Sequence, residues 1–283
     1  MKMKILFSSL VFTTALLTSC DKNPSSDSEK KDSLSLNQED TKLKPKEGVL
    51  IGQKYTLRAL KDSPTFPESK LTIASPSTGQ ILDAGSVDFQ FKVIDGEYQL
   101  GSQTSDADNK SCSNSAKGQH IHLILNNKPY EAVYGENYTT KAQLEEGNHV
   151  VLAFISRSYH ESLKHKEAYV LSQFQVGDKV IQDPIDLSAQ HLFYSRPKGS
   201  YNISEASKIF LDFYLVNTEI SAGNNYVRVA IDGDEFKITS WEPYIIEGLK
   251  AGVHTIKIQL YDKDGNYIEG PFNTTERTFT VTQ

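Results

Sequence analysis

The sequence predicts an all-β protein made of two tandem immunoglobulin-like β-sandwiches. Three observations lead to this prediction. The chain beyond residue 70 repeats itself, each repeat is a series of short alternating runs separated by turn residues, and no window shows helical periodicity for more than a few turns. About 230 residues follow the N-terminal segments, which is enough for two domains of about a hundred residues each.

The internal repeat aligns residues 76–176 with residues 196–281. The matching stretches are GQILDAGSVDFQFKV (79–93) with 199–215, HIHLILNN (120–127) with 226–233, LEEGNH (144–149) with 249–254, and FQV (174–176) with 279–281. In the second copy the apolar residues of 209–215 alternate with polar or amphipathic ones, as in a strand with one face in a core. Asp232-Gly233 and Asp264-Gly265 predict tight hairpin turns.

Residues 1–19 have the layout of a secretory signal. Lys2 and Lys4 precede a mostly apolar stretch that is too short to span a membrane, and small polar residues then lead to Cys20. The tetrapeptide Leu17-Thr18-Ser19-Cys20 resembles the bacterial lipobox. This resemblance implies that the Cys20 thiol receives a diacylglycerol and that the signal is cleaved just before it. The alternative is an ordinary cleaved signal with a cysteine shortly after the cleavage site.

The rest of the chain divides by composition. Residues 20–46 are almost purely polar and predict a disordered tether, because they have nothing to bury. We then expect a strap or edge strand of the first sandwich (47–70), the first sandwich (71–178), a linker (179–190) and the second sandwich (191–283). The protein would thus be exported and anchored to a membrane by its lipid. We expect the outer membrane, although Asp21 would favour the inner one under enterobacterial sorting rules.

Charge and cysteine content exclude some classes of protein. Cleavage of the signal removes two of the 30 basic residues and leaves 28 against 36 acidic ones, a formal charge of −8. An acidic chain without basic clusters is a poor partner for nucleic acid, whose binding depends on neutralised phosphates. Cys112 is the only cysteine besides Cys20, so lipidation of Cys20 leaves no intramolecular disulfide.

Differences between the two copies point to functional residues. His149 and His254 occupy the same position after a glycine-containing turn, so we assign both to the scaffold, with rings bonded to loop backbone. His120 and His122 have no histidine counterparts in the second copy. Residues i and i+2 of a strand share a face, so these two imidazoles can chelate one metal ion. Because Ile121 takes the core side, the pair points away from the core.

The first copy also carries an insertion. The offset between the copies falls from 122 at Phe91 to 106 at His120, which places 16 extra residues within 101–117. In immunoglobulin order this insertion is the B–C loop and residues 157–166 are the F–G loop, and both emerge at the same end. The candidate metal ligands brought together there are His120, His122, His160, His165 and Cys112. Imidazoles with an optional thiolate suit copper or zinc, although no closed zinc motif is present.

The His-x-His-Leu strand at 120–123, the later Gly-x-His turn and the loop histidine resemble small exported bacterial domains of unassigned function, over roughly residues 72–176. The second repeat resembles C-terminal modules of Bacteroidetes-type lipoproteins. These resemblances imply an exported, histidine-bearing sandwich and name no activity.

Three functions therefore remain open. The first is binding of copper or zinc by the histidines. The second is an adaptor or recognition module for an envelope protein or glycan, with Tyr134, Tyr138 and Tyr159 as contacts. The third is an enzyme, which we expect least because Gly-x-Ser-x-Gly, His-Glu-x-x-His and phosphate-loop motifs are missing from the sequence. We expect a non-enzymatic binding module in which Trp241 packs against the second core.

Overall fold

The computed structural model describes residues 47–94, 97–110, 112–178 and 184–283. The predicted signal (1–19) and tether (20–46), Cys20 included, lie outside the described residues, as does the first part of the predicted linker. Almost all regular structure is β-strand, which confirms the predicted fold class. The helices of these described residues are the short 3₁₀ turns η1 (Ala107–Asn109), η2 (Lys166–Ala168) and η3 (Ile203–Lys208). In this described part, no helix is long and apolar enough to cross a membrane.

The first repeat forms a two-sheet sandwich. Its strands are β3 (Lys70–Ser75), β4 (Ile81–Leu82), β5 (Asp88–Ile94), β6 (His120–Leu125), β7 (Glu131–Val133), β8 (Asn137–Thr139), β9 (Gly147–Ser156) and β10 (Tyr169–Val176). One sheet has the order β3-β5-β8 and the other β4-β10-β9-β6-β7. Apolar side chains of both sheets meet in a core that includes Phe89, Ile121 and Phe174. The described residues of 101–117 lie between β5 and β6, as predicted.

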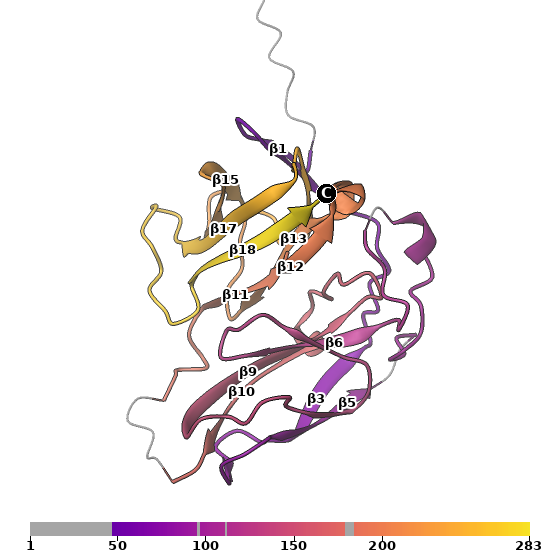
Figure 1. Ribbon diagram of the computed structural model, residues 1–283. Helices are drawn as coiled ribbons and strands as arrows, with labels where there is room; N and C mark the ends of the chain where they lie inside the picture. The colour runs from indigo at the N-terminus through magenta and orange to yellow at the C-terminus, as the bar shows by residue number, and fades with distance from the viewer. Residues whose placement is uncertain (1–46, 95–96, 111, 179–183) are drawn as a thin grey trace, which may run out of the picture. The chain divides into compact units, whose positions relative to one another are not determined.

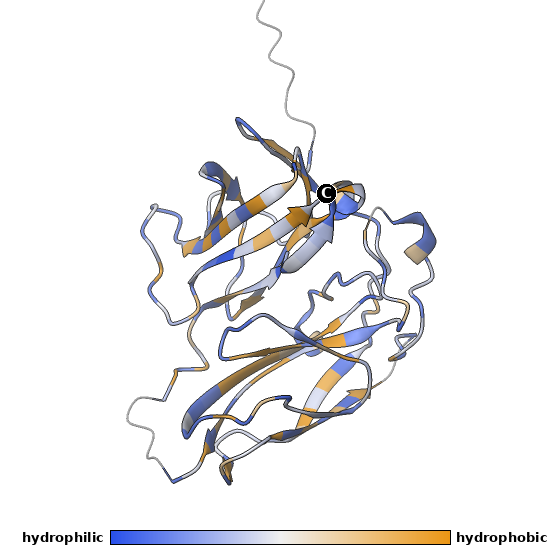
Figure 2. Ribbon diagram, viewed as in Figure 1, coloured by the Kyte–Doolittle hydropathy of each residue, from blue (hydrophilic) through white to orange (hydrophobic). Residues whose placement is uncertain are grey.

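The second repeat has the same strand order. Its strands are β11 (His191–Arg196), β12 (Gly199–Asn202), β13 (Phe210–Val216), β14 (Tyr226–Ile231), β15 (Asp234–Ile238), β16 (Tyr244–Glu247), β17 (Gly252–Tyr261) and β18 (Thr274–Thr282). In both copies one short strand pairs in parallel with the last strand, β4 with β10 and β12 with β18. Figure 1 shows β12 beside β18. Figure 2 shows hydrophobic and hydrophilic bands alternating along β17, where burial alternates in step.

The strap before residue 61 belongs to the second sandwich, so the prediction that it extends the first is wrong. β1 (Val49–Ile51) and β2 (Thr56–Ala59) form a hairpin, and β2 pairs with β16 to give a sheet β1-β2-β16-β13-β11. Leu57 is fully buried in the second core. The Asp234 carboxylate accepts the backbone N–H groups of residues 53–55. The hairpin is closer in sequence to the first sandwich, but tertiary packing places it on the second, through the pairing of β2 with β16.

A further apolar cluster joins the two repeats. Side chains of β6 and β9 that point away from the first core pack against side chains of β11 and β13 that point away from the second, among them Ile124, Leu152, Phe154, Phe193 and Tyr214. This packing buries Val150, Leu152 and Phe154 of β9 and Tyr214 and Val216 of β13, while alternate residues of the same strands face the two sandwich cores. The outer face of β6, which carries His120 and His122, is therefore covered by protein.

Candidate metal centre

His120 and His122 lie on β6 and point away from the first core, as the alternation of that strand predicted. Their neighbours Ile121 and Leu123 are in that core. The two histidines are nevertheless fully buried, with no exposed surface. The predicted direction is confirmed, but this face of β6 is not open to solvent, because the second repeat covers it.

His160 completes a cluster of three imidazoles. It lies in the loop between β9 and β10 with a positive φ of 68°, a conformation uncommon outside glycine and asparagine. His120 Nε2 is 3.0 Å from His122 Nε2 and 2.9 Å from His160 Nδ1. One ligand atom of each ring lies within 4.8 Å of the others.

The insertion and the β9–β10 loop meet at this end of the sandwich. Thr104 N–H donates to Ser158 Oγ at 3.1 Å, and Ser158 N–H donates to Thr104 Oγ1 at 2.9 Å. Ser115 N–H donates to the Ser158 carbonyl at 2.9 Å. These bonds confirm the predicted meeting of the two loops, and they hold the loop that carries His160.

The hydrogen bonds define which ring nitrogen of His120 is free. His120 Nδ1 donates its proton to the Gly118 carbonyl at 2.8 Å, because a carbonyl oxygen can only accept. In a neutral ring Nε2 then has one lone pair and no proton. That single lone pair faces two nitrogens, of His122 and His160, at hydrogen-bond distance. It can accept from only one of them, so the other contact has no proton between its two nitrogens.

The surroundings keep these rings neutral. Burial lowers the pKa of His120 to about 4, against the Gly118 hydrogen bond, which raises it. Burial likewise lowers the pKa of His122 and His160 well below the usual value. The positive charges of Arg196 and Lys198 add to the lowering for all three rings. A neutral imidazole is the form that binds a metal ion.

Several residues around the cluster were not found from the sequence. The Tyr130 ring stacks on His122 with centroids 3.6 Å apart, and Ser195 Oγ lies 3.4 Å from His122 Nδ1. Arg196 is 6% exposed, and its Nε and Nη1 have no hydrogen-bond partner among the described residues. The sequence contained one indication of Arg196, which is a difference between the copies. Arg196 precedes Pro197, whereas the residue before Pro76 in the first copy is a serine. Its proximity to the histidines follows only from the docking of the two repeats.

Two of the five predicted ligands lie elsewhere. His165 lines a surface hollow together with Lys164 and Trp241. Cys112 is buried in a separate apolar cluster with residues such as Tyr159 and Phe210. Burial raises the pKa of the Cys112 thiol to about 12, so the thiolate that a metal needs is not formed near neutral pH. Among the described residues the group that could hold a metal ion is His120, His122 and His160.

The residues assigned to the scaffold make local contacts. His149 Nε2 donates to the Glu145 carbonyl at 2.8 Å, and Nδ1 accepts from Asn126 at 2.8 Å. His254 makes the equivalent bond to the carbonyl four residues before it, also at 2.8 Å, and its Nδ1 lies 2.7 Å from Asp232. Trp241 packs against both the second core and the cluster between the repeats. Its indole N–H donates to a backbone carbonyl at 3.0 Å.

The three tyrosines considered as contacts for a partner make most of their contacts within the protein. Tyr159 is fully buried, and its hydroxyl donates to Asp106 at 3.1 Å. Tyr138 packs against the first core. Tyr134 is half-buried, with its ring centroid 4.9 Å from that of His120. Tyr159 therefore cannot contact a partner in this structure, because no part of its side chain is exposed.

No protein-family model matches the chain, and no curated protein matches it. Among solved structures it is similar to fibronectin(III)-like modules of CbhA from Clostridium thermocellum, with 13% identity over 75% of this chain and 94% of that one and a TM-score of 0.26. It is also similar to dimeric latent PorU from Porphyromonas gingivalis (13% identity, 79% and 21% covered, TM-score 0.25). A third similar structure is the Bacteroides ovatus protein SGBP-B in complex with a mixed-linkage heptasaccharide (10% identity, 75% and 70% covered, TM-score 0.21). Scores of this size carry no argument about function, and the fold assignment rests on the sheets themselves.

Proposed function

We propose that this chain is a lipid-anchored, non-enzymatic binding module of the bacterial cell envelope, and that it holds a copper or zinc ion through His120, His122 and His160. One observation carries the metal part of the proposal. The His120 Nε2 lone pair faces two further ring nitrogens at 2.9 and 3.0 Å and can accept a proton from only one. A metal ion accepts a lone pair from each of the three rings and so removes the conflict.

The two contacts of His120 suit such an ion after a small adjustment, and the three ligand atoms lie within 4.8 Å of one another. Copper and zinc bind imidazole nitrogen at about 2.0–2.1 Å, which places the nitrogens of a tetrahedral site about 3.3 Å apart. The contacts of His120 are shorter than this by only a few tenths of an ångström. The hydrogen bond from His120 Nδ1 to Gly118 orients that ring and directs Nε2 to the centre, as the outer partners of metal-bound histidines do.

The charges favour a singly charged ion. The three ligands are neutral, and two cations, Arg196 and Lys198, are near enough to lower the pKa of each histidine. A divalent ion adds twice the repulsion of a monovalent one, at a site with little water to screen it. Because the three imidazole ligands carry no charge, we expect cuprous ion to bind this site more tightly than zinc.

The experiment is metal binding by the full chain in detergent, measured by titration with cuprous, cupric and zinc ions and by metal analysis after dialysis. The test variant is His160→Asn, because asparagine tolerates the left-handed backbone at this position. We expect it to weaken binding at least tenfold. The control is His149→Gln, which changes a histidine outside the cluster and should leave binding unchanged. Equal affinities for wild type and His160→Asn would overturn the metal proposal.

The membrane anchor is tested separately. Cys20 follows a lipobox-like sequence, and a polar segment of 26 residues separates it from the first described residue. Metabolic labelling with palmitate should mark the wild type and not Cys20→Ala. Equal labelling of the two would refute the anchor and leave the metal site untouched.

A second candidate function is recognition of an envelope glycan. Two hollows, of about 400 and 720 Å³, share the residues Lys164, His165 and Trp241. A tryptophan beside charged and hydroxyl side chains suits the faces and hydroxyls of a sugar. Because Trp241 is the single tryptophan, its fluorescence reports binding there directly. A spectrum unchanged by saturating envelope polysaccharide would count against this candidate.

A further inference from the structure

A buried lysine and a buried aspartate join the two repeats. Lys164 belongs to the β9–β10 loop of the first repeat and Asp212 to β13 of the second. Lys164 Nζ is 2.6 Å from Asp212 Oδ1. The aspartate side chain has no exposed surface, and the lysine side chain is 13% exposed. Such a pair has little water to stabilise its charges, and its desolvation is costly.

Aromatic rings and hydrogen bonds hold the amine against the carboxyl group. Lys164 Nζ lies 5.1 Å from the centroid of the Trp241 ring and within 6.0 Å of the ring centroids of two residues of β13. It also donates to Ser162 Oγ at 2.9 Å and to a β13 backbone carbonyl at 3.1 Å. Ser162 N–H donates to the other aspartate oxygen, Oδ2, at 3.3 Å.

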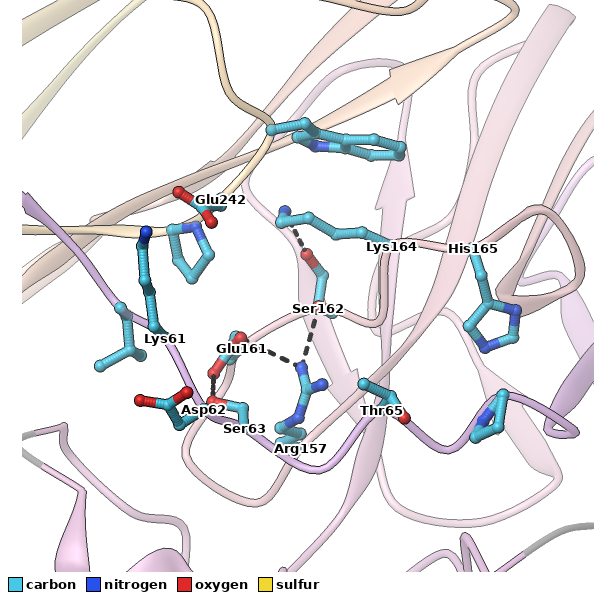
Figure 3. Close-up of a pocket in the computed structure, with 14 residues that line it drawn as sticks. Lys61, Asp62, Ser63, Thr65, Arg157, Glu161, Ser162, Lys164, His165 and Glu242 are labelled. Atoms are coloured by element: carbon cyan, nitrogen blue, oxygen red, sulfur yellow. Dashed lines mark hydrogen bonds and ion pairs between the residues drawn. The ribbon is translucent and has the colours of Figure 1, made fainter. Parts of the chain in front are cut away.

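The loop that carries Lys164 is itself anchored. Arg157 and Glu161 form a buried ion pair at 3.2 Å, and Glu161 accepts a hydrogen bond from Ser63 at 2.7 Å. Arg157 also donates to the carbonyls of Pro64 and Ser162. Figure 3 shows this network beside Lys164, on the wall of a hollow of about 400 Å³. Reacting groups held in this way need little further ordering to reach each other.

We propose that Lys164 and Asp212 condense spontaneously to an isopeptide bond, a covalent link between the two repeats. A proton first passes from Nζ to Oδ1 along their hydrogen bond, which gives an amine and a carboxylic acid. The Nζ lone pair then attacks Asp212 Cγ. The tetrahedral intermediate carries its negative charge on Oδ2, where Ser162 N–H already donates. The C–Oδ1 bond breaks, Oδ1 leaves as water with the second amine proton, and an amide remains.

The balance of this step needs no oxidant or cofactor, since its products are one amide and one water. The hollow beside Lys164 is open to solvent and gives the water a way out. Burial of the aspartate and the surrounding rings then keep water away from the amide. The consequence is a closed covalent loop of residues 164–212, and the loop that carries His160 becomes fixed to the second repeat.

The experiment is peptide mapping of the isolated full chain by trypsin digestion and mass spectrometry. Trypsin does not cut after an acylated lysine. We therefore expect a branched peptide that joins residues 158–166 to residues 209–228, one water lighter than the two together. The exposed pair Lys141–Glu131 is the control within the same digest, and normal cleavage is expected after Lys141.

Lys164→Arg is the matched variant, because arginine keeps the cation beside Asp212 and its guanidinium does not form this amide. The branched peptide should be absent from its digest. Recovery of the two linear wild-type peptides, 158–164 and 209–228, without the branched one would overturn the proposal. The mapping requires no metal, so its outcome is independent of the proposed metal site.

Discussion

Leu57 provides a direct test of where the N-terminal hairpin belongs. It lies on β2, is fully buried, and packs in the core of the second repeat. The change Leu57→Ala removes three carbon groups from that core, which costs about 2.4 kcal/mol at about 0.8 kcal/mol each. A cavity left behind adds to this, and buried leucine-to-alanine changes cost about 3–5 kcal/mol in all. We expect the free energy of unfolding to fall by an amount near the lower end of this range, because a hairpin at the edge of the sheet can shift and partly fill the cavity.

The control is Ile51→Ala on the same hairpin. The Ile51 side chain is 74% exposed, so its loss should change the free energy of unfolding by no more than about 0.5 kcal/mol. The assay is urea unfolding of both variants, followed by the fluorescence of Trp241, the single tryptophan. Trp241 packs against the second core, so it reports the repeat in which the loss is expected. Midpoints that fall equally for the two variants would refute the assignment of β2 to the second core.

Three further predictions follow from single sites. The buried Cys112 thiol, with its pKa raised to about 12, should resist alkylation at pH 8 in the folded protein and react readily in urea; equal rates would contradict its burial. At Gly52 an added Cβ would clash with the Asp234 carboxylate, so Gly52→Ala should lower the free energy of unfolding by about 1–3 kcal/mol. Gly135→Ala, whose added Cβ meets nothing within 4 Å, should leave it unchanged in the same urea assay. The metal-free protein should lose stability as pH falls from 6.5 toward 4, because the unfolded chain binds a proton at His120 that the buried ring, with its pKa lowered to about 4, does not. The slope is about 1.4 kcal/mol per pH unit for each such histidine, and a flat profile of unfolding free energy against pH would contradict it.

Much of the site could be predicted because a repeat contains its own comparison. The offset of 122 between Phe91 and Phe213, and of 106 between His120 and Tyr226, recurs in the strand bounds of both sandwiches. That comparison separated His149, which has a counterpart, from His120, which has none. Alternation along β6 then placed His120 and His122 on one face, since side chains of a strand alternate strictly.

The two misplaced ligands were chosen by loop membership alone. His165 and Cys112 lie in the right loops, but a loop of ten or more residues can direct its side chains to several surroundings. Cys112 is apolar enough to enter a core cluster with Tyr159. Side-chain direction in a loop follows from its tertiary contacts, and the sequence has no period that reveals them.

The sequence by itself determined the fold class, the repeat, the two loops that meet and the strand that carries two histidines. Each of these follows from local patterns of period two or from comparison of one copy with the other. Only the tertiary structure decided which faces are buried. It assigned the hairpin of Leu57 to the second core, covered His120 and His122 with that repeat, and set Lys164 against Asp212. These outcomes depend on how one sandwich docks on another, and docking is an interaction between surfaces distant in sequence.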